Sequence, residues 1–424
     1  MSIEDNSVFP APVFKDTVLG PLFEKVKAHH TEPFRRINHA HCVMLAETDL
    51  LTPEQAKSIA AALLDVDTQM DAASLVYDGT VEDFFFHVER ELVGRLGADL
   101  AGRLHTGRSR NDIDHTIFKM SLKRAIDQTA AKARALCAAM ISKAEAEAET
   151  LIVAYTHGQP AQPSTFGHYL AAGIEGLLRD LERLEAARHT CDLCSMGAAA
   201  ITTTGFAIDR HRMAELLGFS DPQQNAYGCI AAVDYVTSTY SALQLIALHL
   251  GRIAQDLQHW SSFEVGQLYV PNAYVQISSI MPQKRNPVPV EHLRLLLSLA
   301  FGRANGMLSV MHNTPFTDMN DSEGEVQTGG YAAFEALDRA LDLMTGLIGA
   351  VSINTEMVTR NTDRACITIT ELADGLVRVE GLAFRAAHEI ASEVARTVVA
   401  AGQSLGDAGY PSFCGAFATQ TGRP

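Results

Sequence analysis

Five long segments constrain the fold of this 424-residue chain more than any other feature. Each is rich in alanine, leucine and other strong helix formers, and none contains proline, which interrupts a helix interior. They exceed the usual globular helix of about three to four turns, which favours a bundle of long antiparallel helices. The segments are Asp112–Thr150, Gly167–Thr190, Tyr235–Phe263, Val290–Val310 and Glu323–Ile348.

Shorter helices are expected on both sides of these segments. Thr52-Pro53-Glu54-Gln55 is a good helix start, with threonine as the N-cap and glutamine three residues later. A further helical unit is expected from Asn361 to Ala401, whereas the glycine-rich residues 402–424 look poorly structured. The chain is therefore predicted to be mainly α, with an N-terminal helical domain (1–111), a central long-helix bundle (112–360) and an apparently shortened C-terminal helical domain (361–424).

The composition excludes several classes of partner. A formal net charge of −16 argues against nucleic acid, which needs a basic footprint. No run of about 18 apolar residues occurs, so no membrane partner is expected. The first residues lack a basic segment followed by an apolar core, which favours a cytoplasmic protein. Seven scattered cysteines do not suggest a disulfide framework.

Two short motifs have metal-like spacing. Cys191-x-x-Cys194 has no second pair at zinc-finger spacing nearby, so two buried thiols are the favoured interpretation over half a zinc site or a redox pair. His39-x-His41 does not put both rings on one helix face. We therefore expect no metal site at either motif.

The chemistry-rich stretch is Ile277–His292, which reads ISSIMPQKRNPVPVEH. Its three prolines predict a loop of defined shape rather than a helix or a central strand. Lys284 and Asn286 can bind a carboxylate while Ser278 or Ser279 works beside it. The alternative is a polar surface turn.

Two further polar segments precede long helical segments. Residues 104–112 read LHTGRSRND, and arginines at a helix N-terminus suit an anion, although solvated capping residues are an equal alternative. Residues 155–168 read YTHGQPAQPSTFGH. There Pro160 and Pro163 hold a loop that offers His157 as a proton carrier, with the hydroxyl of Thr156 and the amide of Gln162.

Together the three segments resemble the argininosuccinate lyase branch of the aspartase/fumarase superfamily. The first is similar to that branch's HTGRSRND segment, the second to its THxQxAQP segment, and the third to its SSIMPQKxNP loop. The resemblance runs from about residue 36 to residue 390. It implies three helical domains and a homotetramer with a 20-helix core, in which each active site collects residues from three subunits. It also implies reversible anti elimination of fumarate from an N-succinyl amine, without metal or organic cofactor.

The resemblance also implies a role for each site residue. Ser278 is expected to be the general base, and Lys284 and Asn286 to stabilise the aci-carboxylate. His157, paired with Glu291, is expected to be the acid or an electrostatic partner. The remaining expected substrate-binding residues are Ser109, Arg110, Asn111, Thr156, Gln162 and Asn38.

Departures from the family pattern cluster where the leaving amine is expected. Asn38 replaces a serine, Val233 an arginine, and Asp318, Glu323 and Val326 replace tyrosine, glutamine and lysine. Carboxylates there favour a cationic amine, so ethylenediamine-N,N′-disuccinate or a similar aminocarboxylate is the first expected substrate. Argininosuccinate, giving arginine and fumarate, is the alternative. A catalytically weak, crystallin-like structural protein is the alternative of another class.

Overall fold

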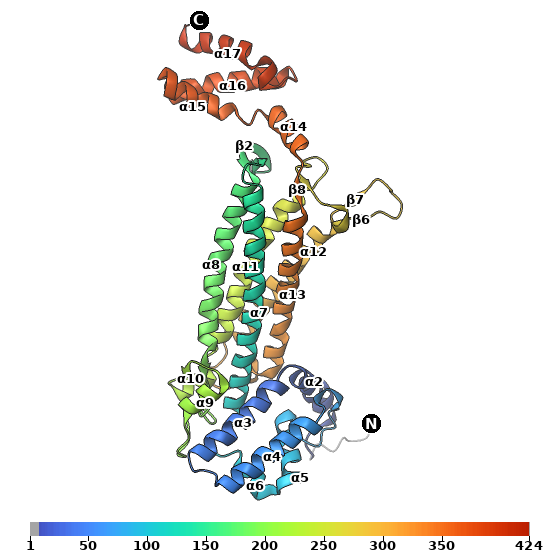
Figure 1. The fold of residues 1–424 in the computed structure, drawn as a ribbon, viewed down its shortest axis with the longest axis vertical. Helices are drawn as coiled ribbons and strands as arrows, with labels where there is room; N and C mark the ends of the chain where they lie inside the picture. The colour runs from blue at the N-terminus through green and yellow to red at the C-terminus, as the bar shows by residue number, and fades with distance from the viewer. Residues whose placement is uncertain (1–7, 424) are drawn as a thin grey trace. The chain divides into compact units, whose positions relative to one another are not determined.

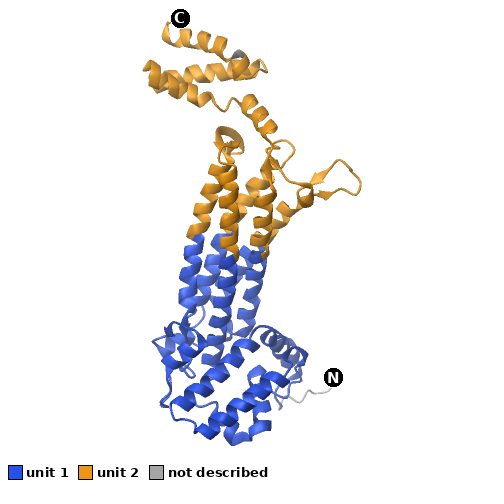
Figure 2. Ribbon diagram, in the orientation of Figure 1, with its two compact units in different colours: residues 1–131, 180–247, 298–338 blue, residues 132–179, 248–297, 339–424 orange. Residues whose placement is uncertain are grey.

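The computed structural model describes residues 8–423. Figure 2 colours the two compact units into which the chain divides. Unit 1 comprises the described residues through Ala131, with Asp180–Ala247 and Ser298–Asp338. Unit 2 comprises Lys132–Arg179, Leu248–Leu297 and the described residues from Arg339. The predicted division at residues 111 and 360 stays a prediction.

The five long helices expected from the sequence are all present (Figure 1). Each begins and ends within a few residues of its predicted bounds, because long stretches of helix formers without proline leave few other places to stop. They are α7 (Arg110–Ala146), α8 (Phe166–Cys191), α11 (Asp234–Trp260), α12 (Val288–Met311) and α13 (Gly324–Ala350).

These helices pack closely in both units. In unit 1, a Cβ on Gly330 of α13 would fall 2.0 Å from the hydroxyl oxygen of Tyr240 on α11, so only glycine permits this approach. In unit 2, Gly173 of α8 lies against Met140 of α7 and Ile253 of α11. Within each unit, buried leucine, alanine and methionine side chains fill the space between these helices.

Unit 1 also contains the short helices of the N-terminal region. The capping box predicted at Thr52 is confirmed, with the Thr52 side chain accepting from the Gln55 amide and the Gln55 side chain accepting from the Thr52 amide. Helix α3 packs on α4, and α4 on α5. The helices are α1 (Pro12–Phe14), α2 (Gly20–His29), α3 (Thr31–Glu47), α4 (Pro53–Gln69), α5 (Phe84–Leu96), α6 (Ala98–Arg103), α9 (Arg210–Leu217) and α10 (Ala226–Ala231), with a π-helix at Lys15–Leu19 and short 3₁₀ turns at Ala72–Ser74 and Asn320–Ser322.

Within residues 8–423, the strands form four two-stranded sheets. β1 (Leu151–Thr156) and β2 (Gln159–Thr165) make an antiparallel hairpin where the sequence indicated only a loop. Within 277–292, expected to be irregular throughout, two short strands pair and α12 already begins at Val288, because Pro289 is tolerated in a first helical turn. The other strands are β3 (Leu193–Cys194) parallel to β4 (Asp221–Pro222), β5 (Leu268–Tyr269) antiparallel to β8 (Ser352–Ile353), and β6 (Gln276–Ile277) antiparallel to β7 (Arg285–Asn286).

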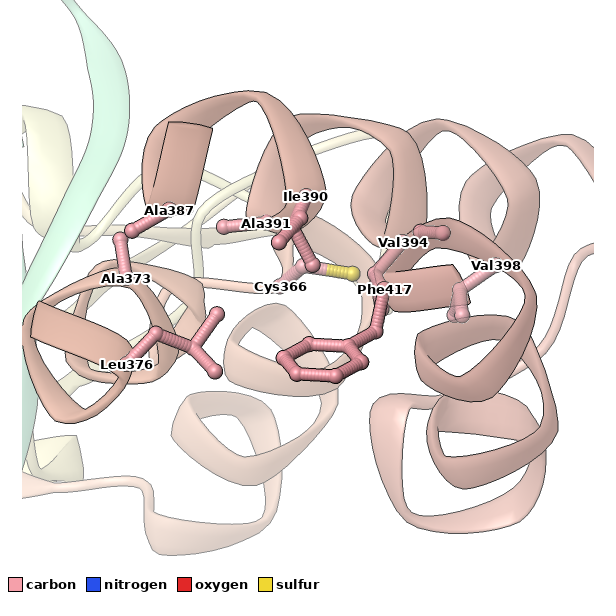
Figure 3. Packing of buried hydrophobic residues seen from close by; sticks show 10 residues of the cluster. Cys366, Ala373, Leu376, Ala387, Ile390, Ala391, Val394, Val398 and Phe417 are labelled. Atoms are coloured by element: carbon pink, nitrogen blue, oxygen red, sulfur yellow. The ribbon is translucent and has the colours of Figure 1, made fainter. Parts of the chain in front are cut away.

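One prediction about the last residues of the chain is wrong. Residues 402–424 were expected to be poorly structured, but α17 (Leu405–Thr421) occupies most of them, with Ser404 as its N-cap and Pro411 inside the helix. Helix α17 packs on α16, and Phe417 joins a buried cluster with Leu376, Ile390 and Val394 (Figure 3). Burial of this apolar face offsets the low helix propensity of glycine and proline. The preceding helices are α14 (Thr355–Ala365), α15 (Ile369–Glu380) and α16 (Phe384–Ala400), and a 3₁₀ turn spans Asn272–Tyr274.

Among the described residues, no helix combines the length and apolarity that crossing a membrane requires.

Candidate active site

The segment 104–112 is held in place by Asp112, which is fully buried near the start of α7. One carboxylate oxygen accepts the Ser109 N–H at 2.8 Å. The other accepts the N–H groups of Gly197 at 2.9 Å and Ala199 at 3.1 Å. Burial raises the pKa of Asp112 to about 6, although these three donors pull it down. Asp112 therefore fixes the backbone that carries the predicted anion-binding residues.

Ser109 and Asn111 lie together and reach the segment expected to contact the amine. The Ser109 hydroxyl donates to Asn111 Oδ1 at 3.2 Å, and Asn111 Nδ2 donates to Asp318 Oδ2 at 2.6 Å. Unit 1 thus brings two predicted substrate-binding side chains beside Asp318. Their hydrogen bonds fix the orientation of both the amide and the carboxylate.

Arg110 and Asn38 already have protein partners. One terminal nitrogen of Arg110 lies 3.0 Å from Glu82 Oε1 and 2.7 Å from Asp83 Oδ2. Asn38 is only 2% exposed, and its Oδ1 accepts a hydrogen bond from Arg108 Nη1 at 2.8 Å. A substrate carboxylate would have to compete with Glu82 and Asp83 for Arg110, so the roles of Arg110 and Asn38 stay predictions.

A cluster of acidic groups surrounds one buried histidine, and the sequence reasoning missed the histidine. One ligand atom each of His115, Asp318 and Glu323 lies within 4.8 Å of the others. Burial, then the nearby Asp114 and Asp318 carboxyls, raise the pKa of Glu323 well above its usual value. Burial, then the charge of Lys119, lower the pKa of His115 to about 3, so this ring is neutral. The sequence could have indicated His115 as a site residue, because His115 follows Asn111 by four residues on α7 and residues at this spacing lie on the same helix face.

His157 occupies the tip of the β1–β2 hairpin in unit 2. Thr156 and Gln159 pair across a two-residue turn, in which His157 has φ +53° and Gly158 φ +73°. Two positive φ values define the type I′ turn that suits a hairpin, and Gly158 adopts this backbone without strain. Thr156, His157 and Gln162 are all exposed. The hairpin therefore displays the predicted proton carrier toward solvent in a fixed backbone conformation.

The segment between β6 and β7 carries Ser278 and Lys284. The Ser278 hydroxyl oxygen accepts the N–H groups of Met281 at 3.1 Å and Ile280 at 3.4 Å. Arg285 of β7 donates to the Val270 carbonyl oxygen at 2.8 Å, which ties the hairpin to the residue after β5. Two backbone donors aimed at one hydroxyl oxygen favour its deprotonated form, which is what a serine base requires.

The expected contact between His157 and Glu291 in unit 2 is absent from the described residues. Among the residues that the structure describes, no hydrogen bond or ion pair joins His157 to Glu291. Lys284 and Glu291 are exposed, and Asn286 lies in β7 opposite Gln276. The catalytic roles of Ser278, His157, Lys284 and Glu291 consequently stay predictions.

The two metal-like motifs differ in their surroundings. Cys191 and Cys194 are fully buried, and burial raises their pKa values to about 11 and about 12, so both are protonated thiols. His39 Nε2 lies 2.7 Å from Asp67, whereas His41 is buried and its Nε2 lies 2.9 Å from the Thr106 carbonyl oxygen. Their different partners fit the expectation that the two rings do not share a helix face.

Comparison with known proteins identifies the family. A family model described as Lyase matches residues 24–302, and one described as Argininosuccinate lyase C-terminal matches residues 366–414. The second match covers much of the region that the sequence analysis underestimated. The first match includes every predicted site residue, from Asn38 to Glu291. The second match includes helices α15 and α16.

Individual relatives agree with this family. The chain is 63% identical to "Argininosuccinate lyase 2" of Agrobacterium fabrum, over 99% of this chain and 83% of that protein. It is 35% identical to "Argininosuccinate lyase" of Methanococcus maripaludis, over 84% of this chain and 74% of that protein. A crystal structure of EDDS lyase in complex with formate superimposes with a TM-score of 0.85 at 30% identity, covering 95% of this chain and 81% of that one.

The fold, the ordered set of polar segments and these likenesses agree on the reaction class, which sets aside the crystallin-like alternative. The chain belongs to the argininosuccinate lyase branch of the aspartase/fumarase superfamily, and it is a fumarate-forming carbon–nitrogen lyase.

Proposed function

We propose that this enzyme releases fumarate from argininosuccinate and leaves arginine. The observation that carries the proposal is the 63% identity, over 99% of the chain, to a protein named argininosuccinate lyase 2. Relatives at 34% to 36% identity carry the argininosuccinate lyase name too. This support outweighs the departures at positions 38, 233, 318, 323 and 326, on which the preference for ethylenediamine-N,N′-disuccinate depended.

A second candidate substrate keeps specific support. EDDS lyase is a structural neighbour at a TM-score of 0.85, and Asp318 and Glu323 place carboxyl groups beside Asn111. Carboxylates there would disfavour the carboxylate of an arginine product and would favour an ammonium group. An aminocarboxylate with two amines is therefore the alternative substrate class.

Ser278 is the proposed general base, because its hydroxyl oxygen faces the N–H groups of Met281 and Ile280. These donors, with the ammonium of Lys284 nearby in sequence, would lower the pKa of the serine so that it can remove the Cβ proton. The same ammonium, with the Asn286 amide, would stabilise the aci-carboxylate that forms after proton removal. Elimination would then expel the amine and leave fumarate.

His157 and Glu291 are proposed as the acid or electrostatic pair. Both are exposed in the isolated chain, so each is free to meet a group from substrate or from another subunit. Ser109 and Asn111 would bind a carboxylate of the succinyl group by turning their donors from Asn111 Oδ1 and Asp318 to the substrate. Arg110, Thr156 and Gln162 are proposed as further contacts to the substrate. Asn38 would act through Arg108, its hydrogen-bond partner.

We also propose a homotetramer in which three subunits supply each active site. Supporting features are apolar side chains that stay exposed on the long helices, including Leu248 at 53%, Leu295 at 52% and Phe301 at 40%. Such side chains need a partner surface, and burial of a helix stripe between subunits would supply one. The seven free thiols fit a reducing compartment, which supports a cytoplasmic location.

The substrate proposal is tested by measuring kcat/KM for argininosuccinate and for ethylenediamine-N,N′-disuccinate, with fumarate release as the common signal. A clear preference for argininosuccinate supports the proposal. A preference for the diamine compound would replace it with the second candidate, without changing the reaction class.

Assembly is tested by mixing two inactive variants, Ser278→Ala and His157→Ala. Shared sites would recover part of the activity, because some mixed tetramers contain one intact site. If mixed tetramers form and remain inactive, the three-subunit site is wrong.

A further inference from the structure

The hairpin that carries His157 is held at its base by one buried glutamine. Gln267 lies immediately before β5 and is fully buried. Its side-chain amide binds both backbone polar groups of Val153 in β1. The Val153 N–H donates to Gln267 Oε1 at 3.1 Å, and Gln267 Nε2 donates to the Val153 carbonyl oxygen at 3.3 Å. For this residue of β1, the glutamine side chain therefore takes the place of a neighbouring strand.

The pairing of the hairpin explains why Val153 needs this partner. Val153 is opposite Pro163 in the β1–β2 pair, and proline has no N–H to donate. Both backbone groups of Val153 are bonded to Gln267, so they point away from β2, as in the non-hydrogen-bonded pairs of an antiparallel ladder. Val153 is fully buried, so these groups would have no hydrogen-bond partner if an apolar side chain replaced Gln267.

Gln267 is itself fixed by its own backbone. Its carbonyl oxygen accepts the N–H of Asn354, the N-cap of α14, at 2.9 Å, and β5 directly after it pairs with β8. The residue after β5 is Val270, whose carbonyl oxygen accepts from Arg285 at the base of the loop that carries Ser278. One short segment thus supports both exposed loops of unit 2.

The bonded residue of β1 lies four positions before the tip of the hairpin. At about 3.3 Å per residue, His157 is about 13 Å along the strand from Val153, so a tilt of about 5° at the base would move the tip by about 1 Å. Between them, the Tyr155 ring packs edge-on against His259 with 5.2 Å between ring centroids. A displacement of about 1 Å in a catalytic group can lower a rate by as much as about 10²-fold.

From these contacts we propose that Gln267 is a positioning residue, which places His157 for the elimination reaction through the backbone of Val153. Gln267 is fully buried, so it acts through the hairpin and not on the substrate. This role of Gln267 rests on the proposed role of His157, and it does not depend on which amine is the substrate.

The test replaces Gln267 with methionine, which keeps the length of the side chain and removes both hydrogen bonds. We expect kcat for fumarate release to fall about tenfold or more while KM changes little, because His157 is proposed to act in the chemical step. In a His157→Ala background the same substitution should cause no further loss, because the group that Gln267 positions is already absent. Gln267→Asn, which keeps the amide but withdraws it by one methylene, should show the same dependence on His157.

Ser404→Ala is the control for a loss of stability alone. It removes the N-cap side chain of α17 in the same unit, which should lower the melting temperature. Its kcat should equal that of the wild type when every variant is assayed below its melting temperature.

The possible results distinguish this role of Gln267 from the proposed role of His157. If His157→Ala lowers kcat but the Gln267 variants keep wild-type kcat, or lower it by the same factor in both backgrounds, Gln267 does not position His157 and the role of His157 stands. A kcat loss in Ser404→Ala as large as that in Gln267→Met, or failure of both Gln267 variants to fold, would leave Gln267 a residue of stability only and overturn the proposal. If His157→Ala keeps its activity, the role of His157 fails, and the role of Gln267 fails with it.

Discussion

Unit 1 and unit 2 each carry part of the predicted active site, and the two parts differ in how completely the chain builds them. In unit 1 the predicted side chains Ser109, Arg110 and Asn111 are half-buried and have hydrogen-bond partners, and the buried Asp112 accepts from three backbone N–H groups. In unit 2 the loops are open, with Ile277 and Ile280 at 78% and 83% exposure beside Ser278. The unit 1 part is formed within one chain, whereas the unit 2 part displays its chemistry to solvent.

This contrast predicts that substitutions in the unit 1 part mainly lower stability, whereas substitutions in the unit 2 part mainly lower activity. Buried hydrogen bonds contribute to folding, so substitutions in the unit 1 part should weaken the fold. Exposed loop residues contribute little to folding and can be selected for chemistry alone. Four experiments test this contrast.

Ser278→Ala should produce the largest effect. Loss of a general base lowers kcat by about 10² to 10⁴, while the free energy of unfolding should change by less than about 0.5 kcal/mol because the loop is open to water. Fumarate release and urea unfolding measure the two quantities. Ser279→Ala is the matched control and should retain most activity. A Ser278 variant that keeps its activity would remove this residue from the mechanism.

Asp112→Ala should reverse that pattern in unit 1. Three backbone N–H groups would lose their acceptor at once, and each buried donor left unpaired costs about 1–3 kcal/mol, so a loss of at least about 3 kcal/mol is expected. Urea unfolding compared with Asp321→Ala, an exposed carboxylate in the same unit, isolates the effect of burial. Equal stability of the two variants would contradict the contrast between buried and open parts.

His30 is expected to make the free energy of unfolding depend on pH. Burial, then the charges of His29 and Arg124, lower the pKa of His30 to about 3, against about 6.5 in an unfolded chain. Between these values the unfolded state binds more protons, so stability is full above pH 6.5 and is lost as the pH falls toward 3.

The slope from one such histidine is at most about 1.4 kcal/mol per pH unit. Urea unfolding of His30→Gln at pH 7, 6 and 5 should show a shallower fall than the wild type. His211→Gln changes an exposed histidine and should keep the wild-type slope. Parallel slopes for the His30 variant and the wild type would show that this ring titrates normally.

Gly158→Ala should have the smallest effect. The added methyl group meets no atom within 4 Å, so the cost is only that of a left-handed backbone, about 1 kcal/mol. Gly205→Ala, also with open space but without a positive φ, should cost less. Thermal unfolding distinguishes them, and equal melting temperatures would mean that the His157 turn is not held as the structure indicates.

Much of this molecule could be predicted from local patterns. Helix formers without proline predicted α7, α8, α11, α12 and α13, because propensity summed over many residues outweighs local exceptions. Thr52 and Gln55 predicted their own capping box, since all its atoms lie within one turn. The polar segments around Ser109, His157 and Ser278 could be recognised as site candidates for the same local reason.

Contacts between distant residues decided the rest. Glycine and Pro411 argued against α17, but its packing on α16 buries Phe417 and outweighs propensity. Arg110 was expected to await an anion, yet Glu82 and Asp83 reach it from a separate segment. Asp318 and Glu323 were visible in the sequence, but only folding brings them to the orphaned nitrogen of His115. The sequence determined the long helices through local propensity, and its resemblance to a known family indicated the reaction class. The tertiary structure decided each side chain's partner, because burial and charge pairing depend on residues far apart in the chain.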